Sequence, residues 1–298
     1  MDEIVKNTNK SYAEISKTMK KEHRQLFIKR FLKSKLVLTG FVIVIVALIV
    51  SIFAPLIAQN SPFETNPAER LQGPSSNYIF GTDDLGRDLF SRVIYGIKES
   101  ILVSFSVTMV SSLIGVTIGL YSAYYGILDH ILMRINDGLM AFPSILLAIA
   151  IMAAMGPSTK NVVIALSAVY IPLISRVVRS SALVIKEQTY IEGMHSLGSS
   201  STRIIWKHIA PNTFAPLLVQ ATFVFAVSVI TEAMLSFLGA GIPAPNPSLG
   251  NILYDGKNVI TKAWWMTVFP GVAILLITVG FNMFGDGLRD ALDPRLKN

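Results

Sequence analysis

Hydrophobic and polar positions are segregated along this chain into long blocks. Apolar runs without charge cover residues 36–58, 100–128, 138–159, 161–175, 209–231 and 263–285. The first run has 23 residues; as a helix these rise about 34 Å, enough to cross a hydrocarbon core of about 30 Å. The pattern predicts an all-α polytopic membrane protein with six transmembrane helices.

The first run follows a strongly basic segment, residues 29–35. A secretory signal is the rival interpretation, but its apolar region is only about 7–15 residues long and lies nearer the start of the chain. We therefore interpret residues 36–58 as a retained anchor helix.

Three further features refine the spans. The fourth run is short, but its helix lengthens through Arg176 and Arg179 if these side chains reach an interface. Residues 239–247 are apolar yet rich in Gly and Pro, so we interpret them as a loop or short re-entrant turn. Gly115 and Gly119 have the spacing that permits close approach of a second helix.

Charge sets the orientation, because Lys and Arg are enriched in the cytoplasmic segments of membrane proteins. Six spans place both termini on one side. With that side inside, 19 of the 26 Lys and Arg residues lie inside and seven lie outside. We expect a basic N-terminal segment (1–35) and a C-terminal tail (289–298) in the cytoplasm, and the loop 59–97 outside.

Composition excludes several classes of protein. Apolar residues make up 52% of the 298 residues, charged residues 15%, and the mean hydropathy is +0.54. These values exclude a water-soluble enzyme and a disordered chain, and the absence of Cys excludes a disulfide scaffold and thiolate metal sites. The net charge of +7 lies mainly in the flanks of apolar segments, which indicates membrane topology and not a nucleic-acid surface.

No constellation typical of an enzyme is visible. The four His residues lack metal-ligand spacing, and no phosphate-binding G-x-x-x-x-G-K-[ST] motif occurs, so we expect no bound cofactor, metal or ATP in this chain. The few charged or amide groups expected within the spans are Glu232, Gln220 and Asn282. None provides an acid or His near the midplane, where proton-driven transporters place one. The energy for any transport must then come from a partner.

The loop between the fourth and fifth spans carries the sharpest local signal. Ile191, Met194 and Leu197 recur at i, i+3 and i+6, which predicts a short amphipathic helix, and Gly198 suits its C-terminal stop. Such a helix fits a groove of another protein. A surface helix that only lies among lipid headgroups is the alternative.

Four stretches resemble one family. Glu192-Gly193-Met194 with Gly198 and residues 209–212 are similar to the coupling loop of ATP-binding-cassette (ABC) importer permeases. Residues 80–92, 235–241 and 282–296 resemble the second permease subunit of dipeptide, oligopeptide and nickel importers. The residues that carry this resemblance are, in the coupling loop, Glu192, Gly193, Met194, Leu197, Gly198, Ile209 and Pro211; in the outer loop, Gly81, Thr82, Asp83, Gly86, Arg87, Asp88 and Arg92; and at the C-terminus, Gly285, Asp286, Gly287, Arg289, Asp290, Asp293 and Pro294.

The resemblance implies a type I ABC importer permease fold in a bacterial cell membrane, with a core permease domain at 98–288 and a coupling loop at about 187–206. It implies a homologous second permease, two cytoplasmic ATPase subunits that use the ATP, and an external substrate-binding protein. The substrates it leaves open are di- and oligopeptides, nickel or a metal chelate, and a glutathione-like solute. A membrane scaffold that recruits a cytoplasmic protein is the alternative from a different class.

The outer segment 81–100 supports three interpretations. Leu85, Leu89 and Val93 recur at four-residue steps, and pairs such as Asp83–Arg87 and Asp88–Arg92 have helical spacing, so we expect an amphipathic helix. This helix positions the binding protein, or its charges meet the substrate, or it only packs against the second span and the loop 239–250.

Overall fold

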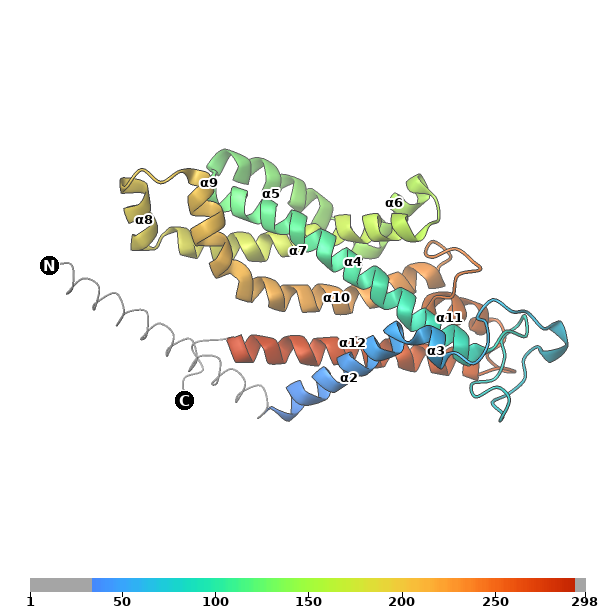
Figure 1. Cartoon of the computed structure of the whole chain (residues 1–298). Coiled ribbons are helices and arrows are strands. Elements are labelled where there is room, and N and C mark those ends of the chain that lie inside the picture. Colours follow the sequence, from blue (N-terminus) through green and yellow to red (C-terminus); the bar gives the residue numbers. More distant parts are fainter. Residues whose placement is uncertain (1–33, 293–298) are drawn as a thin grey trace.

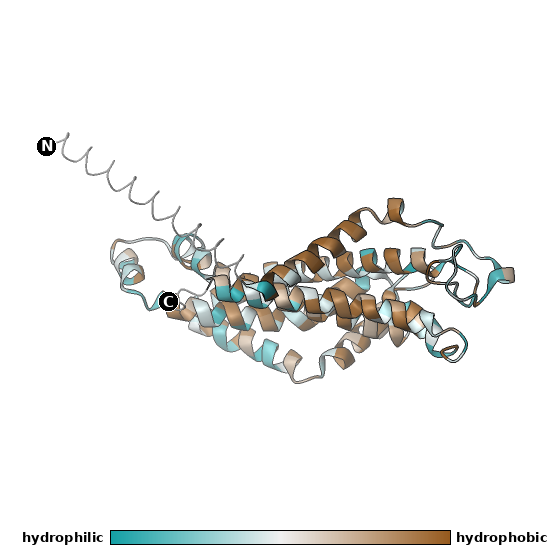
Figure 2. Ribbon diagram, turned by 90° about the horizontal axis from the view of Figure 1, so that it is seen from below, coloured by the Kyte–Doolittle hydropathy of each residue, from teal (hydrophilic) through white to brown (hydrophobic). Residues whose placement is uncertain are grey.

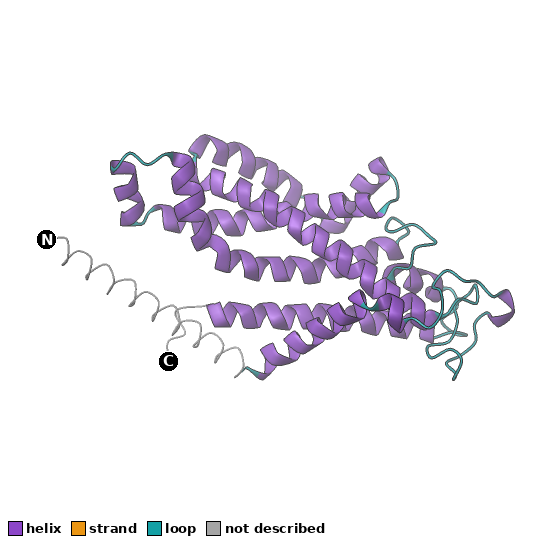
Figure 3. Cartoon of the chain, in the orientation of Figure 1, coloured by secondary structure: helices purple, strands orange, loops and turns teal. Residues whose placement is uncertain are grey.

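The computed structural model describes residues 34–292, and every regular element in that part of the chain is helical (Figure 3). The elements are, in order, α2 (Lys35–Ile52), α3 (Ala54–Ile57), η1 (Pro67–Glu69), α4 (Leu89–Tyr124), α5 (Gly126–Met140), α6 (Ser144–Met155), α7 (Thr159–Lys186), α8 (Thr189–Ser196), α9 (Ser201–Arg203), η2 (Ile204–Ile209), η3 (Ala210–Thr213), α10 (Phe214–Phe237), α11 (Leu249–Lys257) and α12 (Trp265–Leu292). Nearly all of the predicted N-terminal segment, and Asp293 and Pro294, lie outside the described residues.

Five helical stretches are long and apolar enough to cross a membrane: α2, α4, α7, the continuous stretch Ser201–Phe237 that includes α10, and α12. The pair α5 and α6 makes a sixth if it is one broken span. This agrees in number and chain order with the six predicted spans.

The third span differs from its prediction as one helix over 138–159. The chain runs through α5, turns, and continues as α6, and the two axes differ by 94°. Pro143 stands at the turn as the N-cap of α6. Proline has no backbone N–H and disfavours helical geometry in the residue before it, which is Phe142, so the helix breaks there although its composition stays apolar.

The fourth span is longer than its apolar run, as predicted, and it continues past Arg176 and Arg179 to Lys186. Arg179 donates two hydrogen bonds to Asp129 of α5, at 2.5 and 2.6 Å, and Arg176 pairs with Asp137 of α5 at 2.6 Å. Both arginines of α7 thus pair with acids of the neighbouring helix α5.

Glycines allow α4 and α7 to approach closely, as the spacing of Gly115 and Gly119 predicted. A Cβ at Gly115 would stand 2.8 Å from the Ile174 side chain, and one at Gly119 would stand 2.7 Å from the Ser175 carbonyl oxygen. Both glycines are buried against α7.

Two apolar cores share α4 and α10. One core joins these two helices to α6, α7, α8 and η2, and the other joins them to α2, α11 and α12. The helices run lengthwise: α8 and α9 lie at one end with the start of α2 and the end of α12, and α11 and the loop 59–88 lie at the other (Figure 1). Brown apolar ribbon covers much of the length between these ends (Figure 2). We call the end with α8 and α9 the α8 end, and the end with α11 and the loop 59–88 the α11 end.

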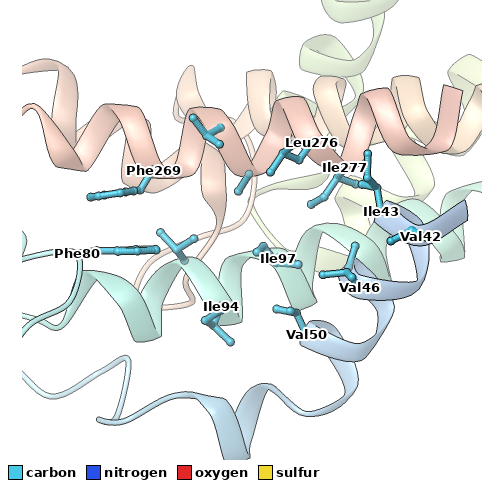
Figure 4. Close-up of a pocket in the computed structure, with 14 residues that line it drawn as sticks. Val42, Ile43, Val46, Val50, Phe80, Ile94, Ile97, Phe269, Leu276 and Ile277 are labelled. Atoms are coloured by element: carbon cyan, nitrogen blue, oxygen red, sulfur yellow. The ribbon is translucent and has the colours of Figure 1, made fainter. Parts of the chain in front are cut away.

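An apolar cavity of about 340 Å³ lies between α2, α4 and α12 (Figure 4). At one end of it, the rings of Phe80 and Phe269 stack with their centroids 3.9 Å apart. Because the fourteen lining residues are all apolar, this space suits hydrocarbon and offers no hydrogen-bonding partner to a polar solute.

Candidate functional site

The predicted amphipathic helix of the 186–212 loop is present as α8 at the α8 end of the molecule (Figure 1). Ile191 is buried and Met194 is partly buried against the core. The helix ends as predicted: Gly198 has φ +75°, the Ser199 N–H donates to the Met194 carbonyl, and the Gly198 N–H donates to the His195 carbonyl. These two bonds form a Schellman motif, for which glycine is the favoured residue.

The other side of α8 is open. Glu192 and Gly193 are exposed, and no atom lies within 4 Å of a Cβ built at Gly193. Leu197 was predicted to continue the apolar stripe of Ile191 and Met194, and this is wrong: its side chain is 83% exposed. Leu197 is the C-cap residue, so it leaves the inward face where the helix ends. An apolar side chain this exposed is available to a partner.

One contact ties α8 to α4, and a second set of contacts ties the same end of α4 to α7. The Tyr124 hydroxyl of α4 lies 3.2 Å from His195 Nε2, and the two rings stack. Lys186 Nζ at the end of α7 donates to the Ala123 and Tyr124 carbonyls at 3.2 and 3.3 Å. A force on α8 therefore reaches the ends of both α4 and α7.

The chain returns from α8 through a continuous helical stretch. Ile209 is buried, and Pro211 is exposed in the turn η3 that leads into α10. All seven predicted coupling-loop residues thus lie at one end of the molecule, on or just after α8.

The seven predicted outer-loop residues gather at the opposite end, around Asp83. Its carboxylate accepts from the Leu85 and Arg87 backbone N–H groups, each at 2.9 Å, and from Arg87 Nε at 2.6 Å. Arg92 Nε lies 3.3 Å from the same carboxylate. Both arginines and Asp83 are buried. We call Asp83, Arg87, Arg92 and Asp255 the Asp83 cluster, because Arg87 Nη2 also lies 3.6 Å from Asp255 of α11.

The predicted helix over 81–100 begins only at Leu89, where it is the start of α4. The predicted Asp88–Arg92 ion pair is absent: Asp88 caps α4 by accepting from the Phe90 and Ser91 N–H groups at 3.3 and 3.2 Å. A capping carboxylate accepts from N–H groups at the helix start that have no partner within the helix. Asp88 is used in this way, and this competes with an ion pair to Arg92 one turn later. The Asp83–Arg87 pair does form, but within a tight loop.

The loop is held by close backbone contacts. Gly81 and Gly86 have φ +79° and +75°, and a Cβ at Gly86 would stand 1.8 Å from the Asn66 carbonyl oxygen. The Thr82 carbonyl accepts from Trp265 Nε1 of α12 at 3.0 Å. These contacts favour the third interpretation of this segment, in which its charges are satisfied locally.

Burial raises the pKa of the Asp255 carboxyl, and the neighbouring Asp84 raises it further, against an opposing effect of Arg87. The Asp255 carboxyl is therefore protonated more easily than an ordinary aspartate.

The C-terminal motif lies along α12. Gly285 and Gly287 are buried contact points: a Cβ would stand 2.3 Å from Thr222 Oγ1 at Gly285 and 2.1 Å from Val37 Cγ2 at Gly287. Asp286, Arg289 and Asp290 are exposed. The two glycines thus set the packing of α12 on α10 and α2. Within residues 34–292, no group of three or more His, Asp or Glu side chains is placed to hold a metal ion.

Comparison with known proteins identifies the family. Residues 115–298 match the family described as binding-protein-dependent transport system inner membrane component, and residues 24–74 match the N-terminal transmembrane domain of oligopeptide transport permease C. The chain belongs to this permease family.

The relatives cover nearly the whole chain. It is 46% identical over 271 residues to the dipeptide transport system permease protein DppC of Alkalihalophilus pseudofirmus, covering 91% of this chain and 89% of the relative. It is 40% identical to the probable D,D-dipeptide transport system permease protein DdpC of Escherichia coli, covering 88% of each. It is 39% identical to the glutathione transport system permease protein GsiD of Pectobacterium atrosepticum, covering 91% of each.

A chain of the MetNI methionine ABC transporter, solved in inward-facing conformations, shares the fold. Its TM-score is 0.58 at 20% identity, over 69% of this chain and 98% of that chain. The all-helical arrangement described above is therefore a type I ABC importer permease fold.

One buried site of this permease was not predicted as a site. The Glu232 carboxylate of α10 accepts from the hydroxyls of Ser100 at 2.7 Å, Ser236 at 2.8 Å and Ser248 at 2.8 Å. These serines lie on α4, on α10 and at the N-cap of α11. Glu232 is completely buried and joins three elements. An acid directly at the end of an apolar run was the one sequence signal for it.

Proposed function

We propose that this permease carries peptides across the bacterial cell membrane, driven by ATPase subunits that dock on α8. The observation that carries this proposal is the exposed side of α8, where Glu192, Gly193 and Leu197 are open to a partner. The other side of α8 packs on the apolar core and contacts Tyr124 of α4. The peptide assignment is supported by relatives named as dipeptide and peptide permeases.

The same proposal assigns the α8 end to the cytoplasm. The described chain enters α2 and leaves α12 at that end, so both termini are then cytoplasmic (Figure 1). The excess of Lys and Arg on that side, 19 against seven, supports this orientation.

The proposed partners supply the ATP binding for which this sequence has no motif. It has no phosphate-binding motif, so two cytoplasmic ATPases bind and hydrolyse the ATP, and this chain itself holds no cofactor and performs no covalent chemistry. A homologous second permease completes the pore, and an external binding protein delivers the solute. ATPase closure moves α8, and the contacts at Tyr124 and Lys186 pass this motion to α4 and α7.

A glutathione-like solute is the second candidate, because the GsiD relative is named for glutathione transport. Nickel or a metal chelate remains a third possibility from the resemblance. A non-transporting scaffold is the competing class.

Uptake in a strain that lacks the native permease genes tests the proposal. We expect ATP-dependent uptake of a labelled dipeptide when this chain is expressed with its partner subunits. Uptake of labelled glutathione or nickel instead would reassign the substrate. Absence of ATP-dependent uptake of all three, with the complex assembled, would favour the scaffold.

A further inference from the structure

Three polar side chains lie at one depth on three neighbouring spans. They are Arg176 of α7, Gln220 of α10 and Asn282 of α12. Each is 17 positions from the end of its helix that lies away from α8; these ends are Thr159 for α7, Phe237 for α10 and Trp265 for α12. At 1.5 Å per residue each is about 25 Å along its helix from that end. We call Arg176, Gln220 and Asn282 the polar belt.

Two grooves place the belt on a single face of the molecule. A groove of about 530 Å³ between α7 and α10 is lined by Arg176 and Pro216 among others, and a groove of about 170 Å³ between α10 and α12 is lined by Gln220 and Asn282. Pro216 and Gln220 are four residues apart on α10, so they share one side of that helix. The two grooves therefore flank the same exposed face of α10.

The polar groups of this face are available. Among the described residues, the side-chain amides of Gln220 and Asn282 make no hydrogen bond, and Asp286 and Arg289, which also line the smaller groove, make no ion pair. Polar groups left unbonded against lipid are costly, so such residues in transmembrane helices face water or protein. This face of the permease is therefore not turned to the acyl chains.

The same face of α10 changes character along its length. Toward the α11 end it presents the exposed apolar side chains of Ile230, Met234 and Phe237, which continue the helical spacing of Pro216, Gln220 and Phe223. An apolar half suits a dry seal against a second permease, and a polar half suits a water-filled vestibule. The boundary falls between Gln220 and Phe223.

We propose that the polar belt lines the inner half of the solute pathway and binds the main chain of the passing peptide. This rests on the proposed function. The amides of Gln220 and Asn282 offer both donors and acceptors to peptide N–H and C=O groups. The Arg176–Asp137 pair, at 2.6 Å with each side chain about half exposed, offers both charges to the peptide termini. Contacts to the main chain alone let one pore accept varied side chains.

Substitution in the complete complex tests the binding role. Gln220→Leu and Asn282→Leu should each lower the uptake of labelled di-alanine about threefold to tenfold, the change expected for one lost hydrogen bond. The amount of assembled complex should not change. Ser106→Val is the matched control: Ser106 is also 17 positions from the start of its helix, α4, but its hydroxyl is bonded to the Leu102 carbonyl of that helix at 2.8 Å. Normal uptake in both belt variants, or loss of the second permease from the complex, would overturn the proposal.

Labelling separates this proposal from the proposed function. The chain has no Cys, so Gln220→Cys and Asn282→Cys report accessibility without background. Both should react with a water-soluble maleimide in the assembled complex, and added di-alanine with the binding protein should slow the reaction during turnover. Reaction in the isolated chain but not in the complex would show that the second permease covers the belt and would overturn the proposal. If the wild-type complex imports no peptide although both positions react, the peptide function fails and the aqueous face stands.

Discussion

Asp83 and Arg87 form a buried ion pair within a five-residue loop, with Arg87 Nε 2.6 Å from Asp83 Oδ2. The Arg87 side chain is 8% exposed and the Asp83 side chain is 1% exposed. The pair closes the loop directly before α4, and Arg92 and Asp255 join it from α4 and α11. One network of charges therefore joins the loop, α4 and α11 at this end of the permease.

The ion pair predicts a strong effect of Asp83→Asn on assembly. Removing one partner of a buried pair leaves an uncompensated charge, at a cost of about 3–5 kcal/mol. We expect a lower unfolding temperature and less complex in the membrane, measured by thermal denaturation and immunoblot. Asp84→Asn is the control, because Asp84 is one-third exposed and lies 3.8 Å from Arg87. Equal effects of the two substitutions would contradict the cluster.

Asp255 predicts a dependence on pH. Its raised pKa means that the folded protein holds this proton more tightly than the unfolded chain does. The stabilisation is therefore present at low pH and is lost as the pH rises from the ordinary aspartate value through the raised pKa. Asp255→Asn, which cannot ionise, should flatten this slope in thermal denaturation measured across acidic pH. An unchanged slope would show that Asp255 is not the responsible acid.

Glu232 predicts a graded series. Glu232→Leu leaves three hydroxyls without their acceptor, each buried unsatisfied group costing about 1–3 kcal/mol, whereas Glu232→Gln keeps an acceptor oxygen. Thermal stability should fall steeply for the first and less for the second. Glu99→Gln serves as the control, because Glu99 directly precedes Ser100 and is only partly buried. A fully stable Glu232→Leu would show that the three-element junction does not stabilise the fold.

Much of this architecture could be predicted from the sequence, because apolar run length fixes which segments span and Gly198 marks where α8 stops. The bend before α6 was missed, since hydropathy does not report the direction of a helix after Pro143. The Glu232 junction was missed because Ser100 is 132 residues away in the sequence. Leu197 was misplaced because helical spacing was extended past the last helical residue, Ser196.

The helix stop at Gly198 predicts loss of coupling without loss of folding. Space around its Cβ is open, so Gly198→Val is disfavoured only by φ +75°. We expect transport to be lost while membrane abundance stays near that of the wild type. Gly271→Val is the matched control, because Gly271 lies within α12, away from α8, with equally open surroundings and no positive φ, and it should keep transport. Normal uptake by Gly198→Val would show that this turn is not needed for coupling.

The central claim, that α8 is where the ATPases dock, is tested most directly by cross-linking from Leu197→Cys in the otherwise Cys-free chain. Leu197 is 83% exposed and Ile191 is 1% exposed, so Ile191→Cys is the control on the same helix. With a bifunctional reagent in membranes of the whole complex, we predict a cross-link from position 197 to an ATPase subunit and none from position 191. A cross-link from position 197 to the external binding protein, or to no other subunit of the assembled complex, would contradict the account.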